Sequence, residues 1–278
     1  SGLADYLAED EMDALRICRE VVSHLDWKKT DPSPSYISEE PVHDPEELLG
    51  IVDRDLRQPV DIREVISRIV DGSRFEEFKP LFGPTIICGW ANVHGYPVGI
   101  VGNNGAIYPD SSQKAAHFVQ LCNKIDTPII FLQNVTGFLV GKEFERDGII
   151  KKGSQLINAV SNSTVPHITI ILGASYGAGT YAMSGRAYNN RFTFTWPSAK
   201  IAVMGGKQIA GVMSLVRKAR AFRKGETFNE EEDKKFTEAV ERLQDQGSKA
   251  LEATGLISDC LLYTSPSPRD QRGSGIAA

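Results

Sequence analysis

Three residues in the middle of the chain, Gly177, Ala178 and Gly179, have the types and the spacing that favour binding of a negatively charged oxygen. They follow an apolar, β-branched run (165–172) that is typical of a buried strand. A short apolar helix is expected next, with Ser175 as its N-cap. The first N–H groups of a helix lack partners within it, and the helix dipole is positive there. Because glycines let a ligand approach the backbone, the pattern predicts an anion site built from main-chain donors.

Other chemistries fit this stretch less well. Residues 177–182 match the G-x-G-x-x-A spacing of a dinucleotide site, but that site needs an acid about 20 residues on. The next acid after Gly177 is Glu226. The chain has no G-K-[ST] phosphate loop, no H-E-x-x-H motif and no cysteines at metal spacing. Ser175 lacks the G-x-S-x-G elbow of Ser hydrolases, and His167 is expected to be a core histidine of the strand. Stabilisation of an oxyanion by backbone donors, without a metal, is what remains.

Acidic residues are unevenly distributed along the chain. Between Gly148 and Gly225 there are eleven Lys and Arg residues and no Asp or Glu, although the whole chain has 36 acids and a net charge of −5. A local positive field around a helix start favours an anionic ligand. The charges at 217–224 are also what a solvated helix face would carry, whereas the lack of acids around Gly177 points to a ligand.

The overall composition, with 41% hydrophobic and 24% charged residues, is typical of a soluble globular protein. No run of 18 apolar residues occurs, so no membrane partner is expected, and no nucleic-acid partner is expected either. Cys18, Cys88, Cys122 and Cys260 are each expected to pack as reduced side chains. The chain starts without Met and without a signal or transit peptide. We expect a fragment from the bacterial cytoplasm or, in a eukaryote, from the mitochondrial matrix.

The elements that must position the anion site follow from periodicity. Helices are expected at 7–25, 61–70, 111–125, 151–160, 207–223 and 230–253, with a capped turn at 44–49. Strands are expected at 85–91, 98–102, 128–132, 165–172 and 191–196, and loops at 28–43 and 133–138. In the first helix, Leu15, Cys18, Val22 and Leu25 share the apolar face. The repeated unit of strand, Gly-bearing loop and helix predicts an α/β core with a parallel sheet and with ligands at the carboxyl ends of the strands.

The chain as a whole resembles the β (carboxyltransferase) subunit of biotin-dependent acyl-CoA carboxylases, of the acetyl-, propionyl- and methylcrotonoyl-CoA carboxylase type. Five segments carry the match in family order and spacing: LAEDE (7–11), PVDIREVI with VDGS (59–73), GYPVGI (95–100), NVTGF (134–138), and GAG through GRAY and WPSA to VMGG (177–206). The resemblance implies a crotonase-like (ClpP/crotonase) α/β fold of repeated strand-loop-helix units.

The resemblance also divides the chain. Residues 1–57 would be the end of an N-terminal carboxyltransferase domain with a linker, and residues 58–259 the C-terminal carboxyltransferase domain. Residues 260–278 are foreign to the family and are similar to translated sequencing-adaptor read-through. We expect this tail to be artefactual and leave it out of the predicted fold.

The chemistry that the resemblance implies is transfer of a carboxyl group from carboxybiotin to the α-carbon, or the vinylogous γ-carbon, of a short acyl-CoA. Two backbone N–H groups, which correspond here to Ala178 and Gly179, would bind the ureido oxygen of biotin. Together with Gly177, the loop Thr136-Gly137-Phe138 would form part of the biotin pocket. Tyr181 would face the acyl group. Plain core packing is an equal alternative for Phe138 and for Tyr181.

The implied partners are the acyl-CoA substrate, a biotin carboxylase or biotin carrier subunit that presents carboxybiotin, and further β subunits in a homo-oligomer with the active site at the dimer interface. A second oxyanion hole belongs to the N-terminal half, so the fragment alone is expected to show little catalysis. Two alternatives remain open. One is a crotonase-type acyl-CoA hydratase or isomerase, which usually carries an acidic acid/base that the block around Gly177 lacks. The other is a non-catalytic assembly fragment.

Overall fold

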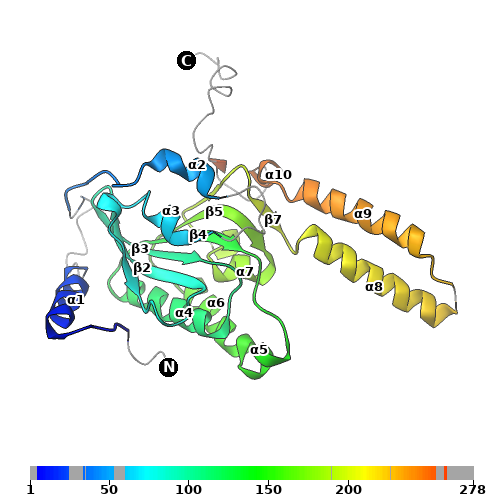
Figure 1. Ribbon diagram of the computed structural model, residues 1–278, viewed down its shortest axis with the longest axis horizontal. Coiled ribbons are helices and arrows are strands. Elements are labelled where there is room, and N and C mark those ends of the chain that lie inside the picture. Colours follow the sequence, from blue (N-terminus) through cyan, green and yellow to red (C-terminus); the bar gives the residue numbers. More distant parts are fainter. Residues whose placement is uncertain are drawn as a thin grey trace, which may run out of the picture.

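The strands form one mixed sheet (Figure 1). The computed structural model describes residues 5–24, 34, 36–52, 60–188, 190–225, 227–254 and 260–261. The strands are β1 (Glu76–Phe78), β2 (Ile86–Val93), β3 (Tyr96–Asn103), β4 (Ile129–Val135), β5 (His167–Tyr176), β6 (Phe192–Thr195), β7 (Lys200–Ala202) and β8 (Cys260–Leu261). Their order is β1-β2-β3-β4-β5-β6-β8, and β7 pairs with β5.

The expected parallel sheet is confirmed from β3 to β6 but is wrong for β1, β2 and β3, which pair antiparallel. The reason is a two-residue turn between β2 and β3. His94 and Gly95 both have positive φ, +50° and +80°. This backbone twist matches that of a hairpin, so the chain reverses directly into the neighbouring strand.

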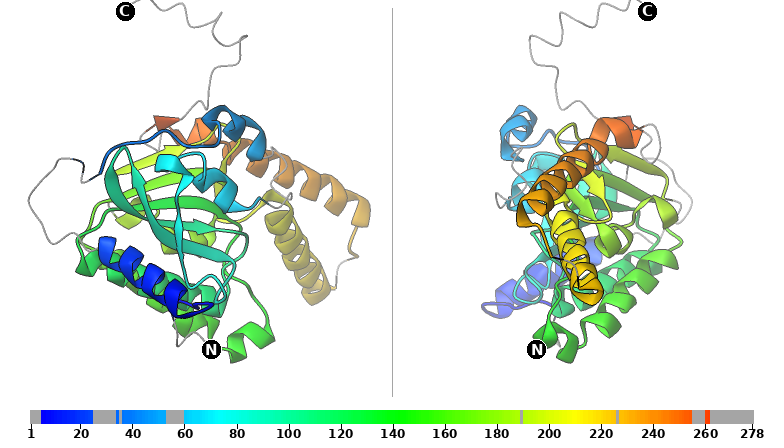
Figure 2. Two further views of the ribbon diagram at one scale, coloured as in Figure 1. Left: turned by 60° about the vertical axis from the view of Figure 1, so that its left-hand side comes forward. Right: turned by 90° about the vertical axis from the view of Figure 1, so that its right-hand side faces the viewer.

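Helices cover both faces of the sheet (Figures 1 and 2). They are α1 (Glu11–Ser23), α2 (Leu48–Ile51), α3 (Ile62–Ile66), α4 (Pro109–Lys124), α5 (Lys142–Arg146), α6 (Ile149–Ser161), α7 (Gly177–Ala182), α8 (Gly206–Lys224), α9 (Glu230–Gly247) and α10 (Ala250–Thr254), with 3-10 turns at Pro45–Glu47, Asp71–Ser73 and Arg186–Tyr188. α2 and α3 lie on one face, and α4 and α6 on the other. No helix in the described part of the chain has the length and apolar content to cross a membrane.

Two apolar cores arise from the alternation of side chains along the strands. Along β2, Ile86, Cys88 and Trp90 pack into the core beneath α4 and α6. Ile87 and Ala91 of the same strand pack into the core beneath α3. Because successive side chains of a strand point to opposite faces, a fully apolar strand is what a sheet covered on both sides requires.

Helix α1 starts later than expected and turns its apolar face outward. Asp10 caps it by accepting a hydrogen bond from the N–H of Asp13, so the helix starts at Glu11 and not at residue 7. Leu15 and Val22 are 60% and 57% exposed. Cys18 is exposed too, contrary to its expected packing, whereas Cys88 and Cys122 are buried as expected. The fourth position of the apolar face, Leu25, lies outside the described residues.

Several other boundaries differ from the expectation. The helix expected at 61–70 ends at Ile66, and α9 ends at Gly247, where Lys249 turns back to bridge to Lys200. Residues 133–135, expected in a loop, belong to β4. β1, β7 and α5 were not expected. Residues 260 and 261, assigned to the tail, pair with β6 as β8. Most of the loop expected at 28–43 lies outside the described residues.

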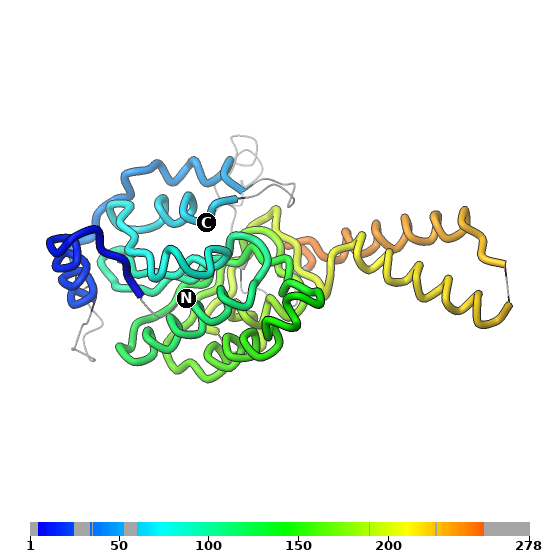
Figure 3. Tube along the Cα trace, turned by 60° about the horizontal axis from the view of Figure 1, so that its bottom comes forward, coloured from blue at the N-terminus to red at the C-terminus, as the bar shows by residue number. Residues whose placement is uncertain are grey.

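Helices α8 and α9 run side by side and project from the body as an arm (Figures 1 and 3). Between them, Ser214 donates a hydrogen bond to Asp233, and the Arg217 guanidinium lies 4.2 Å from the ring centroid of Phe236. The opposite stripe of α8 is apolar and exposed; it consists of Val212, Leu215, Val216 and Phe222.

Candidate active site

Helix α7 begins where β5 ends, at the carboxyl end of the parallel part of the sheet. The expected N-cap, Ser175, is instead a buried strand residue that pairs with Val135 on one side and Ile201 on the other. Tyr176 occupies the N-cap position without a side-chain hydrogen bond to the helix. The strand extends further than expected because β7 pairs with its last residues.

The start of α7 is shaped by two glycines. Gly177 has a φ of +56°, a left-handed conformation that strains any other side chain. A Cβ on Gly179 would lie 2.6 Å from Cγ2 of Val135 and 3.3 Å from Cα of Gly137. Ala178, between the two glycines, is exposed. The structure thus brings the predicted backbone donors against the predicted loop after β4.

The three predicted residues of the loop after β4 differ in their exposure and in their contacts. Thr136 is exposed. Gly137 accepts a hydrogen bond from the N–H of Ile107 at 3.0 Å through its carbonyl. The Phe138 ring packs on α6, because a Cβ on Gly153 would lie 2.9 Å from its Cε1 atom. Phe138 is partly buried and packs against the core, and its predicted part in the biotin pocket stays a prediction.

Tyr181 follows on α7 and is 46% exposed. Its ring lies edge-on to Tyr188, with the ring centroids 6.0 Å apart. Tyr181 follows Ala178 by three residues, about one helical turn, so these two exposed residues are neighbours on the surface of α7. The predicted contact of Tyr181 with the acyl group stays a prediction.

Polar side chains at the end of β4, which the sequence assigned to a loop, tie the site together. Gln133 is fully buried and donates from Nε2 to the carbonyl of Met183 at 2.5 Å. Its Oε1 accepts from Ser175 Oγ at 2.7 Å, and Ser175 Oγ lies 2.9 Å from Thr180 Oγ1. The sequence signal is a glutamine directly after an apolar run, but the partners are more than 40 residues away.

A second tie joins the ends of β3, β4 and β5. The N–H of Asn134 donates to Asn103 Oδ1 at 2.8 Å, and Asn103 Nδ2 donates to the Asn134 carbonyl at 2.6 Å. Asn134 Oδ1 accepts from the N–H of Ala174 at 3.0 Å. These bonds satisfy the backbone where the pairing register of β4 and β5 shifts between Gln133 and Val135.

In the folded protein, an acidic side chain from outside residues 148–225 lies near the strand that leads into α7. Asp245 of α9 lies 3.1 Å from Lys200 Nζ, and burial, with a smaller contribution from Asp245, raises the pKa of Tyr176. The helix arm therefore brings a carboxylate toward the strand that leads into α7. Lys200 partly balances it, so the electrostatic argument from sequence holds only for residues 148–225.

His167 is a core histidine, as expected. Its ring nitrogens lie 2.9 Å from Ser184 Oγ and 2.7 Å from Ser163 Oγ, and burial lowers its pKa to about 4. Burial raises the pKa of the Cys88 thiol to about 12. Neither side chain has the exposure of a catalytic group. Across the described ranges, no three His, Cys, Asp or Glu side chains gather as a metal site requires.

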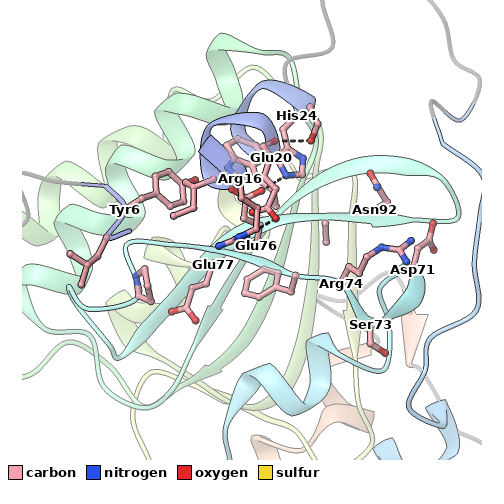
Figure 4. A pocket seen from close by; sticks show the side chains of 17 residues that line it. Tyr6, Arg16, Glu20, His24, Asp71, Ser73, Arg74, Glu76, Glu77 and Asn92 are labelled. Carbon is pink, nitrogen blue, oxygen red and sulfur yellow. Dashed lines mark hydrogen bonds and ion pairs between the residues drawn. The ribbon is translucent and has the colours of Figure 1, made fainter. Parts of the chain in front are cut away.

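A separate cavity of about 730 Å³ lies between α1 and the strands β1 and β2 (Figure 4). At its wall, His24 Nε2 is 2.6 Å from Glu76 Oε2, and the His24 ring stacks on Trp90 with centroids 5.7 Å apart. None of the predicted site residues lines this cavity. It belongs to the junction of α1 with the sheet and not to the α7 site.

Comparison with known proteins decides the family. The carboxyl transferase domain family matches residues 1–254. The chain belongs to this family. The expected crotonase-like carboxyltransferase fold is confirmed by two solved structures. The geranyl-CoA carboxylase beta subunit of P. aeruginosa is 42% identical with a TM-score of 0.76, and transcarboxylase 12S is 30% identical with a TM-score of 0.81. Each match covers 98% of this chain and 51% of the other protein's chain.

Curated family members are similar over nearly the whole chain. A probable biotin-dependent acyl-coenzyme A carboxylase beta2 subunit of Mycobacterium tuberculosis is 54% identical over 98% of this chain and 51% of its own length. The mitochondrial methylcrotonoyl-CoA carboxylase beta chain of Dictyostelium discoideum is 48% identical over 89% of this chain and 42% of its own. The chain thus spans about half the length of these relatives.

Proposed function

We propose that this chain is half of the carboxyltransferase subunit of a biotin-dependent acyl-CoA carboxylase, and that it supplies one wall of the active site. Family membership and the names of the curated relatives support this function. Residues 58–259 would form the C-terminal carboxyltransferase domain, and residues 1–57 the end of the N-terminal domain with a linker. The Dictyostelium relative supports a mitochondrial location; we propose the matrix if the source is a eukaryote and the cytoplasm if it is a bacterium.

The observation that carries the proposal is the contact of Gly179 with the loop after β4, beside the exposed Ala178. The N–H groups of Ala178 and Gly179 are in the first turn of α7, where a helix leaves its donors without internal partners. They would hold the ureido oxygen of biotin. Gly177 and Gly137 have no side chain that would keep the biotin ring away from the backbone. The exposed Thr136 and the partly buried Phe138 of the same loop would complete the biotin pocket.

Biotin, when carboxylated on its carrier subunit, supplies the carboxyl group to be transferred. The role of this chain is electrostatic: fixed donors aimed at developing negative charge lower the barrier without reorganisation, by about 2.7–4 kcal/mol for one such donor in a well-studied case. No side chain of the wall needs to exchange a proton for this. The exposed ring of Tyr181 would contact the acyl part of the coenzyme A thioester.

The partner subunits follow from the same assignment. One solved relative, transcarboxylase 12S, is described as a hexamer. We propose that the full-length subunit forms a homo-oligomer in which the wall containing α7 faces the N-terminal half of another subunit. The outward apolar face of α1 supports the domain division, because Leu15 and Val22 have no cover here and belong, in the proposal, to the neighbouring domain.

The proposal is tested in a full-length subunit that carries this chain as its second half, by following decarboxylation of malonyl-CoA with free biotin. Ala178→Pro removes one donor and should abolish biotin-dependent turnover while coenzyme A binding persists. Ala178→Ser, which keeps the N–H, is the matched control and should stay active. Absence of biotin-dependent turnover in the unaltered subunit would contradict the proposed function. Hydration or isomerisation of an enoyl-CoA without biotin would favour the hydratase alternative.

A further inference from the structure

Helix α7, whose N–H groups are the proposed donors, is too short to keep its position without bonds to the rest of the protein. α7 has only six residues, and its N-cap residue, Tyr176, makes no side-chain capping bond. Isolated helices shorter than about 12 residues are marginal in water. The direction of the Ala178 and Gly179 N–H groups must therefore be set by bonds between α7 and the rest of the protein.

Gln133 makes the bonds that fix α7 at both ends. Its Nε2 donates to the carbonyl of Met183, the residue that ends the helix, at 2.5 Å, and lies 3.5 Å from the Thr180 carbonyl. Its Oε1 accepts from Ser175, which lies just before the helix. Ser175 has then used its own proton, so the 2.9 Å contact between the two hydroxyls is a donation from Thr180 to Ser175.

These bonds form a closed ring with only one arrangement of protons. Thr180 donates to Ser175, Ser175 donates to Gln133, and Gln133 donates back to the helix carbonyls. Each of these three side chains donates one hydrogen bond within the ring, and Gln133 and Ser175 are entirely buried. Breaking a bond of Gln133 or Ser175 leaves a polar group unsatisfied and out of reach of water, which favours a single geometry of the ring; Thr180 is only partly buried.

We propose that Gln133 is a positioning residue that aims the backbone donors of α7. The inference rests on the proposed function of Ala178 and Gly179. Gln133 itself touches no substrate, since it is buried behind the helix. A misplacement of about 1 Å in a catalytic group can cost on the order of 100-fold in rate, so loosening the ring should lower kcat far more than it weakens binding.

The test uses Gln133→Met in the full-length subunit, which fills a similar volume but cannot form the ring. We expect kcat for biotin-dependent decarboxylation to fall about 10- to 100-fold, with the KM for acyl-CoA within about twofold of the unaltered value. The matched control is Asn123→Leu. Asn123 ties α4 to Ser163 and Thr164 near the other end of β5, so its loss should lower stability similarly but leave kcat unchanged.

Gln133→Glu provides the rescue. A protonated carboxyl can accept from Ser175 and donate to the helix carbonyls as the amide does, whereas a carboxylate can only accept. Burial raises the pKa of a carboxyl group, which extends the protonated form toward neutral pH. The kcat of Gln133→Glu should exceed that of Gln133→Met and should fall with rising pH. The ratio of the kcat of the unaltered subunit to the kcat of Gln133→Met should not change with pH.

Hydrogen exchange separates this inference from the proposed function. In Gln133→Met, the amides of Met183 and Ser184, which bond the carbonyls of Gly179 and Tyr181, should exchange at least about tenfold faster than in the unaltered subunit or in Asn123→Leu, whether or not turnover is seen. An active subunit whose kcat survives Gln133→Met would overturn the inference and leave the proposed function standing. An inactive unaltered subunit would remove the proposed function, and unchanged exchange at α7 would show that Gln133 does not position the helix at all.

Discussion

Gly179 and Val135 are in direct contact across the gap between α7 and β4, because a Cβ on the glycine would lie 2.6 Å from Cγ2 of the valine. The contact places the first turn of α7 on the loop that follows β4. Real Cβ atoms do not approach so closely, so the absence of a side chain at residue 179 determines how far the helix can advance toward the loop.

Gly179→Ala should destabilise the protein by about 1–3 kcal/mol, as overpacking of a core does, and should lower turnover by displacing α7. Val135→Ala in the same chain makes room, so the double variant should recover part of both losses. Denaturant titration of the four proteins gives the coupling energy, expected at about 1 kcal/mol. Gly211→Ala, at a helix position with open space around it, is the control and should stabilise the protein. Strict additivity of the two variants would contradict the contact.

The stability of the fold should decrease as the pH falls from 6.5 to about 4, in part because of His167. Burial lowers the pKa of His167 to about 4, so below 6.5 the unfolded chain binds a proton that the folded chain does not. The contribution is fully present above 6.5 and is lost toward pH 4, with a slope of at most about 1.4 kcal/mol per pH unit. Unfolding by urea across this range should give a shallower dependence for His167→Gln; parallel curves would contradict the prediction.

The buried charges around Glu77 should respond unequally to substitution. Glu77 accepts two hydrogen bonds from Arg63 at 2.8 and 2.9 Å, whereas the buried Lys114 ammonium is 3.6 Å away, and burial lowers its pKa. Lys114→Met should therefore cost less than about 1.5 kcal/mol, or even stabilise the protein. Glu77→Gln leaves two cations without their partner and should cost about 3–5 kcal/mol. Urea midpoints rank the two variants, and the reverse order would contradict this account.

The apolar face of α1 should behave differently in the chain alone and in a full-length subunit. Leu15→Lys should change the stability of the chain alone by no more than about 0.5 kcal/mol, because the side chain is 60% exposed. If the N-terminal domain covers this face, as proposed, the same variant should cost about 2 kcal/mol or more there. Thermal unfolding of both forms compares the effects, with Arg19→Lys, which keeps its charge on the same outward face, as control. Equal effects in both forms would argue against the proposed domain division.

The longer strands and the turn from β5 into α7 could be predicted from the sequence because both are local patterns; that this turn binds an anion stays a prediction. β2, β3 and β5 are apolar runs bounded by glycine or proline, and Gly177 to Gly179 indicate the turn into α7. The short elements could not be predicted. β1 consists of Glu76, Glu77 and Phe78, which form a strand only because β2 lies beside them.

The ring around Gln133 was missed for the same reason. Its members are 42 and 47 residues apart in sequence from Gln133, and their partnership follows from the register of β4 on β5. Ser175 was correctly singled out but given a local role, as a cap, where its hydroxyl serves a distant glutamine. The outward face of α1 could not be predicted either, because periodicity identifies an apolar stripe but not whether this chain covers it.

The arm of α8 and α9 is anchored to the sheet at β7. The arm leaves the body just after β7 and returns beside it, where the N–H of Ile201 bonds the Ser248 carbonyl. β7 pairs with the last three residues of β5, Ala174 to Tyr176. Through β7, the arm is therefore joined to the three residues of the sheet that immediately precede α7.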